Sequence, residues 1–193
     1  VGRNLFDHMN LPLFVSINTT ASVTKDKILS VREIYRYLVD GSGVFSTTAV
    51  IGSGRLNDYG VILFGMGSAD EQALKDVANF ETEAFRAFFP LYANSSQEGF
   101  VALSTCLMPR SRGSVRMKFN RDIMIDPAYL KDDYDMECMR NAIRLNARMV
   151  ETKAFQRHGA KIHYPRVIEC RNFGPFDDEE PSDRYLDCII RHA

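Results

Sequence analysis

The sequence lacks the features that mark several large classes of protein. Lys plus Arg total 24 and Asp plus Glu total 25 among 193 residues, so no basic excess indicates binding to nucleic acid or to an anionic membrane surface. No uninterrupted apolar run approaches the roughly 20 residues that a membrane-spanning helix needs, and no signal-peptide pattern is visible. Hydrophobic residues make up 45% of the chain, which suits one globular domain, or one domain with a small piece of another.

Cysteine is scarce, and its spacing argues against a metal site. The four cysteines stand at positions 106, 138, 170 and 188. None has the C-x₂₋₄-C spacing of a zinc site, and no histidine pair supplies the missing ligands, so we predict no metal ligand. Cys106 and Cys138 each lie in a strongly apolar pattern, and for these two we expect buried free thiols.

Two glycosylation sequons are present, Asn18-Thr-Thr and Asn94-Ser-Ser. Together with possible disulfides, they favour a secretory or extracellular location. The chain starts at Val1-Gly2-Arg3, which is not a translation start, and it stops within an amphipathic pattern. We therefore expect it to be a piece of a longer protein.

Hydrophobic periodicity predicts strands and helices in alternation. The strands are expected at 11–18, 44–51, 59–66, 98–107 and 114–119, with His163 in a further strand and 52–58 as a turn. The helices are expected at 24–43, 68–89, 133–157 and from 183 onward, and 171–183 is expected to be a loop. The prediction is an α+β fold, in which a mostly antiparallel sheet of about six strands has helices packed on one face.

Capping residues and apolar stripes support these helices. Thr24 can cap the first helix and Gly41 or Gly43 can end it, while Ser68 and Glu71 form a capping-box pattern. The third helix carries an apolar stripe, which we interpret as core packing, and Gly159 follows it. The stripe consists of Met136, Met139, Ile143, Ala147, Val150 and Ala154. Ser182 or Asp183 can cap the last helix.

Four segments resemble those of the glucose–methanol–choline (GMC) flavoprotein oxidoreductases. "VGRNLFDHMNLPLF" is similar to the V-G-x-N-L-x-D-H segment, and "MPRSRGSVRM" is similar to the P-x-S-R-G-x-V turn. "IDPAYLKDDYDMECMRNAIRLNARMVETKAFQRHG" resembles the D-P-x-Y-L…D…helix segment, and "PSDRYLDCIIRHA" resembles the closing helix. The order and spacing agree across nearly all 193 residues.

The resemblance implies a division of the chain and of the chemistry. Residues 1–10 would end the FAD domain, and 11–193 would form the substrate-binding domain. Family members bind FAD in a Rossmann-like domain and transfer hydride from an alcohol carbon to the flavin, with the help of a histidine in an H-P-x-G-T segment. Here no G-x-G-x-x-G follows a strand, and the chain ends before that histidine. We therefore assign no catalytic and no cofactor-binding residue.

Junction residues are implied by the first motif. We expect Asn4, Asp7 and His8 to lie where the two domains meet, with His8 bracing this junction through hydrogen bonds rather than handling a substrate proton. In the Pro109–Gly113 turn, Gly113 offers a positive φ and Ser111 can bond the local backbone. Arg110 and Arg112 either pair with carboxylates to pin the turn, which we favour, or contact substrate or flavin phosphate.

A pocket lining and a disulfide are also implied. Where other members carry a polar residue before the S-R-G turn this chain has Met108, and Phe45 and Val50 occupy a stretch that lacks an acidic residue. We predict that these three line an apolar substrate pocket, although they can equally face the core. Insect-like members resemble this chain in a cysteine pair that corresponds to Cys170 and Cys188, which implies a bridge.

The leading hypothesis is the substrate-binding portion of an FAD-dependent alcohol dehydrogenase or oxidase, inactive as this chain alone. A hydrophobic alcohol such as a sterol or retinoid is favoured over a sugar or choline, and the main partner is the missing FAD domain of the same polypeptide. The surface that faces that domain should be unusually apolar. The alternative is a ligand-binding remnant without flavin, and a fold-level coincidence with an unrelated α+β enzyme is disfavoured. No serine or cysteine has a neighbouring base and acid that would indicate a nucleophilic hydrolase.

Overall fold

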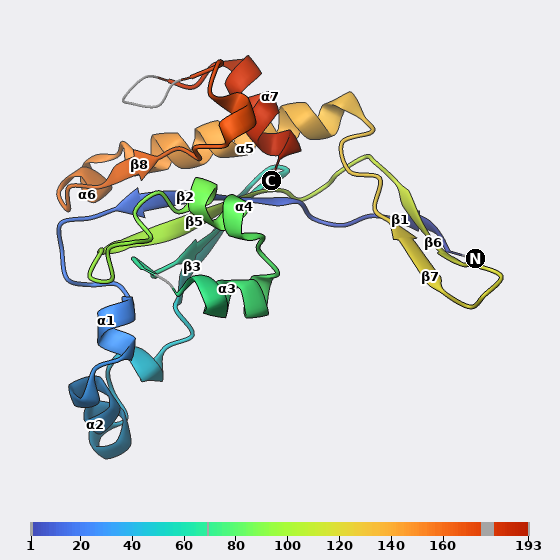
Figure 1. Ribbon diagram of the computed structural model, residues 1–193. Helices are drawn as coiled ribbons and strands as arrows, with labels where there is room; N and C mark the ends of the chain where they lie inside the picture. Colours follow the sequence, from blue (N-terminus) through green and yellow to red (C-terminus); the bar gives the residue numbers. More distant parts are fainter. Residues whose placement is uncertain (1, 69, 175–179, 193) are drawn as a thin grey trace.

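The computed structural model describes residues 2–68, 70–174 and 180–192, whose strands form two antiparallel sheets (Figure 1). The larger sheet has five strands in the order β3-β4-β5-β2-β8, and the smaller has three in the order β1-β6-β7. The strands are β1 (Arg3–Leu5), β2 (Asn10–Ser16), β3 (Val50–Leu56), β4 (Tyr59–Phe64), β5 (Gly99–Cys106), β6 (Gly113–Met117), β7 (Ile123–Asp126) and β8 (Lys161–His163). The α+β class with antiparallel pairing is confirmed, and the strands divide between two sheets.

Helices lie on both sides of the five-stranded sheet in Figure 1. They are α1 (Lys25–Ile28), α2 (Val31–Asp40), α3 (Glu71–Ala78), α4 (Thr82–Phe88), α5 (Asp133–Val150), α6 (Lys153–Gln156) and α7 (Asp183–Arg191), with 3₁₀ turns η1 (Val44–Ser46) and η2 (Ile168–Cys170). The helices α5 to α7 cover one face, α3 and α4 lie on the other side, and α1 and α2 extend beyond the sheet. No helix among the described residues is long and apolar enough to cross a membrane.

The core lies between α5 and the sheet. Alternate residues of β2, namely Leu11, Leu13 and Val15, are fully or almost fully buried and pack with the apolar stripe of α5. All predicted stripe residues from Met136 to Val150 are buried. Ala154 is exposed because α5 ends at Val150 and a short separate helix, α6, begins at Lys153.

The predicted strand 44–51 and turn 52–58 are wrong in their boundaries. Val44 to Ser46 form the 3₁₀ turn η1, and β3 begins only at Val50. The β3–β4 hairpin turns at Asn57 and Asp58, where Asn57 adopts a left-handed φ of 54° that asparagine tolerates well. Most of the glycine-containing stretch therefore belongs to a strand.

Two further predicted helices are also each divided in two. The first breaks between α1 and α2 at Leu29–Ser30, and the second breaks at Asn79, whose φ is 54°. The Ser68 capping box is wrong, because the Ser68 hydroxyl accepts from the Lys25 N–H at 2.8 Å and donates to the Ser95 carbonyl at 2.6 Å. Thr24 does cap α1, and the left-handed Gly41 ends α2.

Two disulfides join the helices to their neighbours. The Cys170–Cys188 bridge, implied by the family resemblance, is present. The prediction of free thiols at Cys106 and Cys138 is wrong, because these residues form the second bridge. Cys106 ends β5 on the face that α5 covers, so packing of the helix brings Cys138 against it. The apolar pattern correctly predicted that Cys106 and Cys138 are buried, but it did not predict that they form a disulfide.

Candidate functional site

The junction between the two sheets is the candidate site. We use this name for the three segments 6–9, 107–112 and 127–132, which run between the β1-β6-β7 sheet and the rest of the molecule (Figure 1). All three overlap the motifs that resemble the GMC family. The contacts among these segments therefore determine how the two sheets are held together.

A single buried carboxylate fixes the Pro109–Gly113 turn. Asp135, 4% exposed in the first turn of α5, accepts the N–H of Arg110 at 2.6 Å and the N–H of Ser111 at 2.9 Å. The Ser111 hydroxyl accepts the N–H of Asp132 at 3.0 Å, so it bonds the start of α5 rather than its own turn. The turn therefore donates hydrogen bonds to helix α5 and accepts one from the residue that caps the helix.

The two arginines of the turn are held by aromatic rings and carbonyl groups. The Arg110 guanidinium lies 4.0 Å from the centre of the Tyr134 ring. Arg112 donates to the carbonyl of Pro109 at 2.6 Å and lies 4.9 Å from the centre of the Phe6 ring. Among the described residues neither arginine pairs with a carboxylate, so the predicted carboxylate pairing is wrong. Instead, the backbone N–H groups of Arg110 and Ser111 bind the carboxylate of Asp135.

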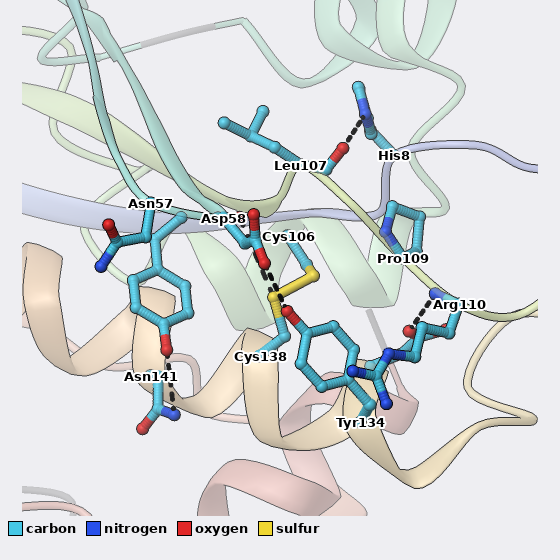
Figure 2. The surroundings of a disulfide bond; sticks show 12 residues. His8, Asn57, Asp58, Cys106, Leu107, Pro109, Arg110, Tyr134, Cys138 and Asn141 are labelled. Atoms are coloured by element: carbon cyan, nitrogen blue, oxygen red, sulfur yellow. Dashed lines mark hydrogen bonds between the residues drawn. A yellow bond between two sulfur atoms is a disulfide. The ribbon is translucent and has the colours of Figure 1, made fainter.

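The β3–β4 hairpin is joined to the same region (Figure 2). The Tyr134 hydroxyl donates to Asp58 at 2.6 Å, and this hydrogen bond raises the pKa of Tyr134 above its ordinary value. The N–H of Leu107 donates to the Asp58 carbonyl at 2.8 Å. Figure 2 shows the Cys106–Cys138 disulfide beside these groups. Hairpin, strand end and helix start thus form one connected unit.

The predicted junction residues contact the other two segments. His8 Nε2 lies 2.9 Å from the Leu107 carbonyl and donates to it. The Asp7 carboxylate accepts the Tyr129 hydroxyl at 2.6 Å, which together with burial raises the pKa of Tyr129 to about 12. Asn4 has a left-handed φ of 66° and lies within β1. The segment 6–9 is therefore bonded to both 107–112 and 127–132.

Close packing leaves little free space in the junction. The cavity there has a volume of about 20 Å³ and is lined by residues that include Asp7, Pro109 and Tyr129. That is room for about one water molecule and not for an alcohol substrate. The positive φ expected for Gly113 is not observed; instead, an added Cβ at this residue would lie 2.0 Å from the Asp126 carbonyl oxygen. Glycine is required there by the close approach of β7.

The structure does not bring the three predicted pocket residues together. Met108 follows β5 at the junction and is 56% exposed. Val50 pairs with Phe64 at the other end of the hairpin, and Phe45 lies in η1 with its ring 6.2 Å from that of Tyr37. All three side chains are exposed, so none is part of the core of the described residues.

One face of the β1-β6-β7 sheet is apolar and exposed. Val115 pairs with Ile125, and Met117 pairs with Ile123, so these four side chains share a face. Their exposed fractions are 40%, 65%, 72% and 70% respectively. A strand face with this composition normally packs against another layer of protein.

Comparison with known proteins gives relatives of the whole chain. No protein-family model matches it. The "Neither inactivation nor afterpotential protein G" of Drosophila melanogaster is 46% identical over 207 residues, which cover 100% of this chain and 36% of that protein. A fungal aryl-alcohol oxidase matches with a TM-score of 0.51 at 17% identity, over 97% of this chain and 36% of that chain. Pyridoxine 4-oxidase from Mesorbium loti matches with a TM-score of 0.49 at 19% identity, over 98% and 30%.

The sequence similarity over the whole of this chain, the likeness in fold to an alcohol oxidase and the four ordered motifs all agree with the resemblance to the GMC oxidoreductases. The chain spans 36% of the length of its Drosophila relative.

Sequence reasoning missed the residue that organises the junction. Asp135 is one of several acidic residues at the start of α5, where acidic side chains commonly complement the helix dipole, so its residue type does not distinguish it. Its spacing did carry a signal, because Asp135 precedes Met136 and is followed by Met139, which places it beside the buried stripe. The hydrogen bond from Tyr134 to Asp58 could not be predicted from the sequence, because it depends on where the β3–β4 hairpin turns.

Proposed function

We propose that this chain is the substrate-binding portion of an FAD-dependent alcohol dehydrogenase or oxidase. The whole enzyme would take a hydride from the CH–OH group of an alcohol and pass it to the flavin. The observation that carries the proposal is the alignment over the whole of this chain, 46% identical, which spans all four GMC-like motifs. The exposed edge strand β3 of the five-stranded sheet supports it, since it leaves a surface that can serve as a wall for a substrate pocket.

The FAD domain of the same polypeptide is the proposed partner. The exposed apolar face formed by Val115, Met117, Ile123 and Ile125 is the surface that we assign to this contact. It agrees with the expectation that a surface facing the flavin domain is unusually apolar. The neighbouring junction residues Asn4, Asp7 and His8 would then lie at the domain boundary.

The described residues of this chain do not fit FAD by themselves. The junction cavity of about 20 Å³ is far too small, and no G-x-G-x-x-G links a strand to a helix. The left-handed glycines Gly41 and Gly159 lie at helix ends, where they terminate helices. The flavin would accept the hydride, but its binding groups and the catalytic base belong to sequence outside this chain.

A hydrophobic alcohol, such as a sterol or retinoid, is the proposed substrate class. Met108 is exposed where other family members place a polar residue, and the sequence from Phe45 to Val50 contains no acidic residue. The Glu33 carboxylate, which accepts the N–H of Val44 at 3.2 Å, is already bonded to Arg36. Because the junction interior has no room for an alcohol, we propose that the exposed Met108 contacts substrate on the outer surface of the junction and that Phe45 and Val50 line its approach.

A secretory or extracellular location is proposed as well. Two disulfides form among the described residues, and they are stable in an oxidising compartment. Asn18 and Asn94 are both exposed, so each could accept a glycan. These features support the location without identifying it.

The test is flavin reduction by alcohols in the full-length polypeptide. We expect visible flavin absorbance that is bleached without oxygen by sterols, retinoids or long-chain alcohols, and far less by glucose or choline. Met108→Glu should raise the KM for the hydrophobic alcohol about tenfold, whereas Ile168→Glu, an equally exposed apolar site on η2, should not.

Each outcome has a distinct meaning. Full-length protein without flavin would overturn the enzyme assignment and favour a ligand-binding remnant. Flavin that only sugars or choline reduce would overturn the hydrophobic substrate and leave the reaction class intact.

A further inference from the structure

A large concave site lies at the opposite end of α5 from the junction. Its volume is about 540 Å³, within the range of small-molecule pockets. The C-terminal half of α5 forms one wall, and β8 with the residues after it forms the other. None of the GMC-like chemistry discussed above involves this pocket.

The floor of the pocket is apolar. Ala147, Val150 and Ala160 are 8%, 2% and 6% exposed, and the partly buried Ile162 adjoins them. Burial raises the pKa of Tyr164 to about 12, so its hydroxyl is a neutral hydrogen-bond donor at physiological pH. A floor of this kind favours a hydrocarbon segment over a sugar.

Cationic side chains surround this floor. Arg148 and Arg166 are exposed at the pocket, and within the part of the chain that the structure describes neither guanidinium has a carboxylate partner. Burial lowers the pKa of His163, and the charges of Lys161 and Arg166 lower it further. The local electrostatic field is therefore positive on the β8 side.

Among the described residues that line the pocket, two carboxylates face four cationic side chains. Glu180 lies 3.9 Å from Arg144, which also donates to Asp183 at 2.5 Å. Glu151 lies at the end of α5 beside Arg148. With Arg144 already occupied by these acidic groups, Arg148 and Arg166 are the cations that can bind a ligand.

We propose that this pocket binds a single-chain amphiphile with an anionic head group. The hydrocarbon chain would lie over Ala147, Val150 and Ala160, and the head group would accept hydrogen bonds from Arg148 and Arg166. A carboxylate or a phosphate would satisfy the same two guanidinium groups. The site is separate from the one assigned to the alcohol, so it does not depend on the proposed oxidoreductase activity.

Calorimetric titration of the full-length polypeptide tests the site. Dodecanoate and dodecyl phosphate are the anionic probes, and methyl dodecanoate is a neutral control that cannot serve as an alcohol substrate. We expect one equivalent of each anion to bind, with the neutral ester at least about tenfold weaker. The stronger of the two anions identifies the head group.

Charge-reversal variants locate the site. Arg148→Glu and Arg166→Glu should each weaken dodecanoate binding by about tenfold or more, while Arg116→Glu on β6 should leave it unchanged. All three arginines are exposed, so the variants should fold. Equal binding of ester and anion, or undiminished binding in both pocket variants, would overturn the proposal whatever the flavin experiment shows.

Discussion

At the scale of single residues, Asp135 joins the Pro109–Gly113 turn to helix α5. Its two carboxylate oxygens accept the consecutive N–H groups of Arg110 and Ser111, in a position where solvent cannot replace it. The Pro109–Gly113 turn therefore owes its shape to a side chain that stands 24 and 25 residues further along the chain.

Replacing Asp135 should destabilise the protein. Asp135→Ala leaves two amides without an acceptor, which should lower the free energy of unfolding by about 3 kcal/mol. Denaturant unfolding measures the change. Asp133→Ala is the matched control, because it removes an exposed charge from the same helix turn. Similar losses in the two variants would show that helix capping, rather than attachment of the turn, is the role of Asp135.

At the scale of elements, apolar patterning predicted most of the helices and strands, but it missed the strands β1 and β7 and did not show where the elements break. The stripe on α5 was predicted correctly because that helix has a large buried face. The first predicted helix has an equally regular pattern, yet Val31, Tyr35 and Leu38 on α2 are 79%, 63% and 75% exposed. A periodic apolar pattern shows which face of a helix can be buried. Whether another segment packs on that face depends on the rest of the protein.

The site was predictable to a similar extent. Motif resemblance singled out Asn4, Asp7 and His8, and the structure places Asp7 and His8 in contact with the other two segments of the junction between the sheets. Their place at a boundary with the FAD domain stays a prediction. The Cys106–Cys138 bridge could not be predicted, because it depends on helix α5 crossing the end of β5. Contacts between distant segments cannot be predicted from one sequence, unless the sequence resembles a family in which those contacts are known.

The hydrogen bonds between α1 and Glu98, which attach this helix to the segment before β5, should depend on pH. Burial opposes ionisation of Glu98, but hydrogen bonds from Lys27 and Ser22 outweigh it and hold the pKa of this carboxyl below its ordinary value of 4.5. A lowered pKa in the folded state stabilises the protein above pH 4.5, and this contribution is lost as the pH falls toward the folded value.

Hydrogen exchange measures this effect. Amides of α1 should exchange faster as the pH falls below about 4.5, after correction for the intrinsic rate. Glu98→Gln should weaken the attachment at neutral pH and remove most of the acid dependence. If wild type and variant keep the same pH profile, the attachment does not depend on this carboxylate.

At the scale of the whole molecule, the β1-β6-β7 sheet projects away from the core (Figure 1). Its apolar face should cause the separate 193-residue chain to self-associate, because about 25 cal/mol favours burial of each Å² of apolar surface. Met117→Lys with Ile123→Lys should reduce the self-association seen by light scattering. The control pair Leu29→Lys, at the end of α1, and Leu38→Lys, on α2, should reduce it less. A monomeric wild-type chain would contradict the assignment of this face to an interdomain contact.

The order of the cysteines has a consequence for synthesis. Both bridges join cysteines that are consecutive in the chain, 106 with 138 and 170 with 188, so neither bridge encloses the other. In an oxidising compartment the first pair can close while the second is still being translated. Of the three pairings open to four cysteines, the native one is thus the pairing that vectorial synthesis favours, and the chain should reach it with little need for disulfide reshuffling.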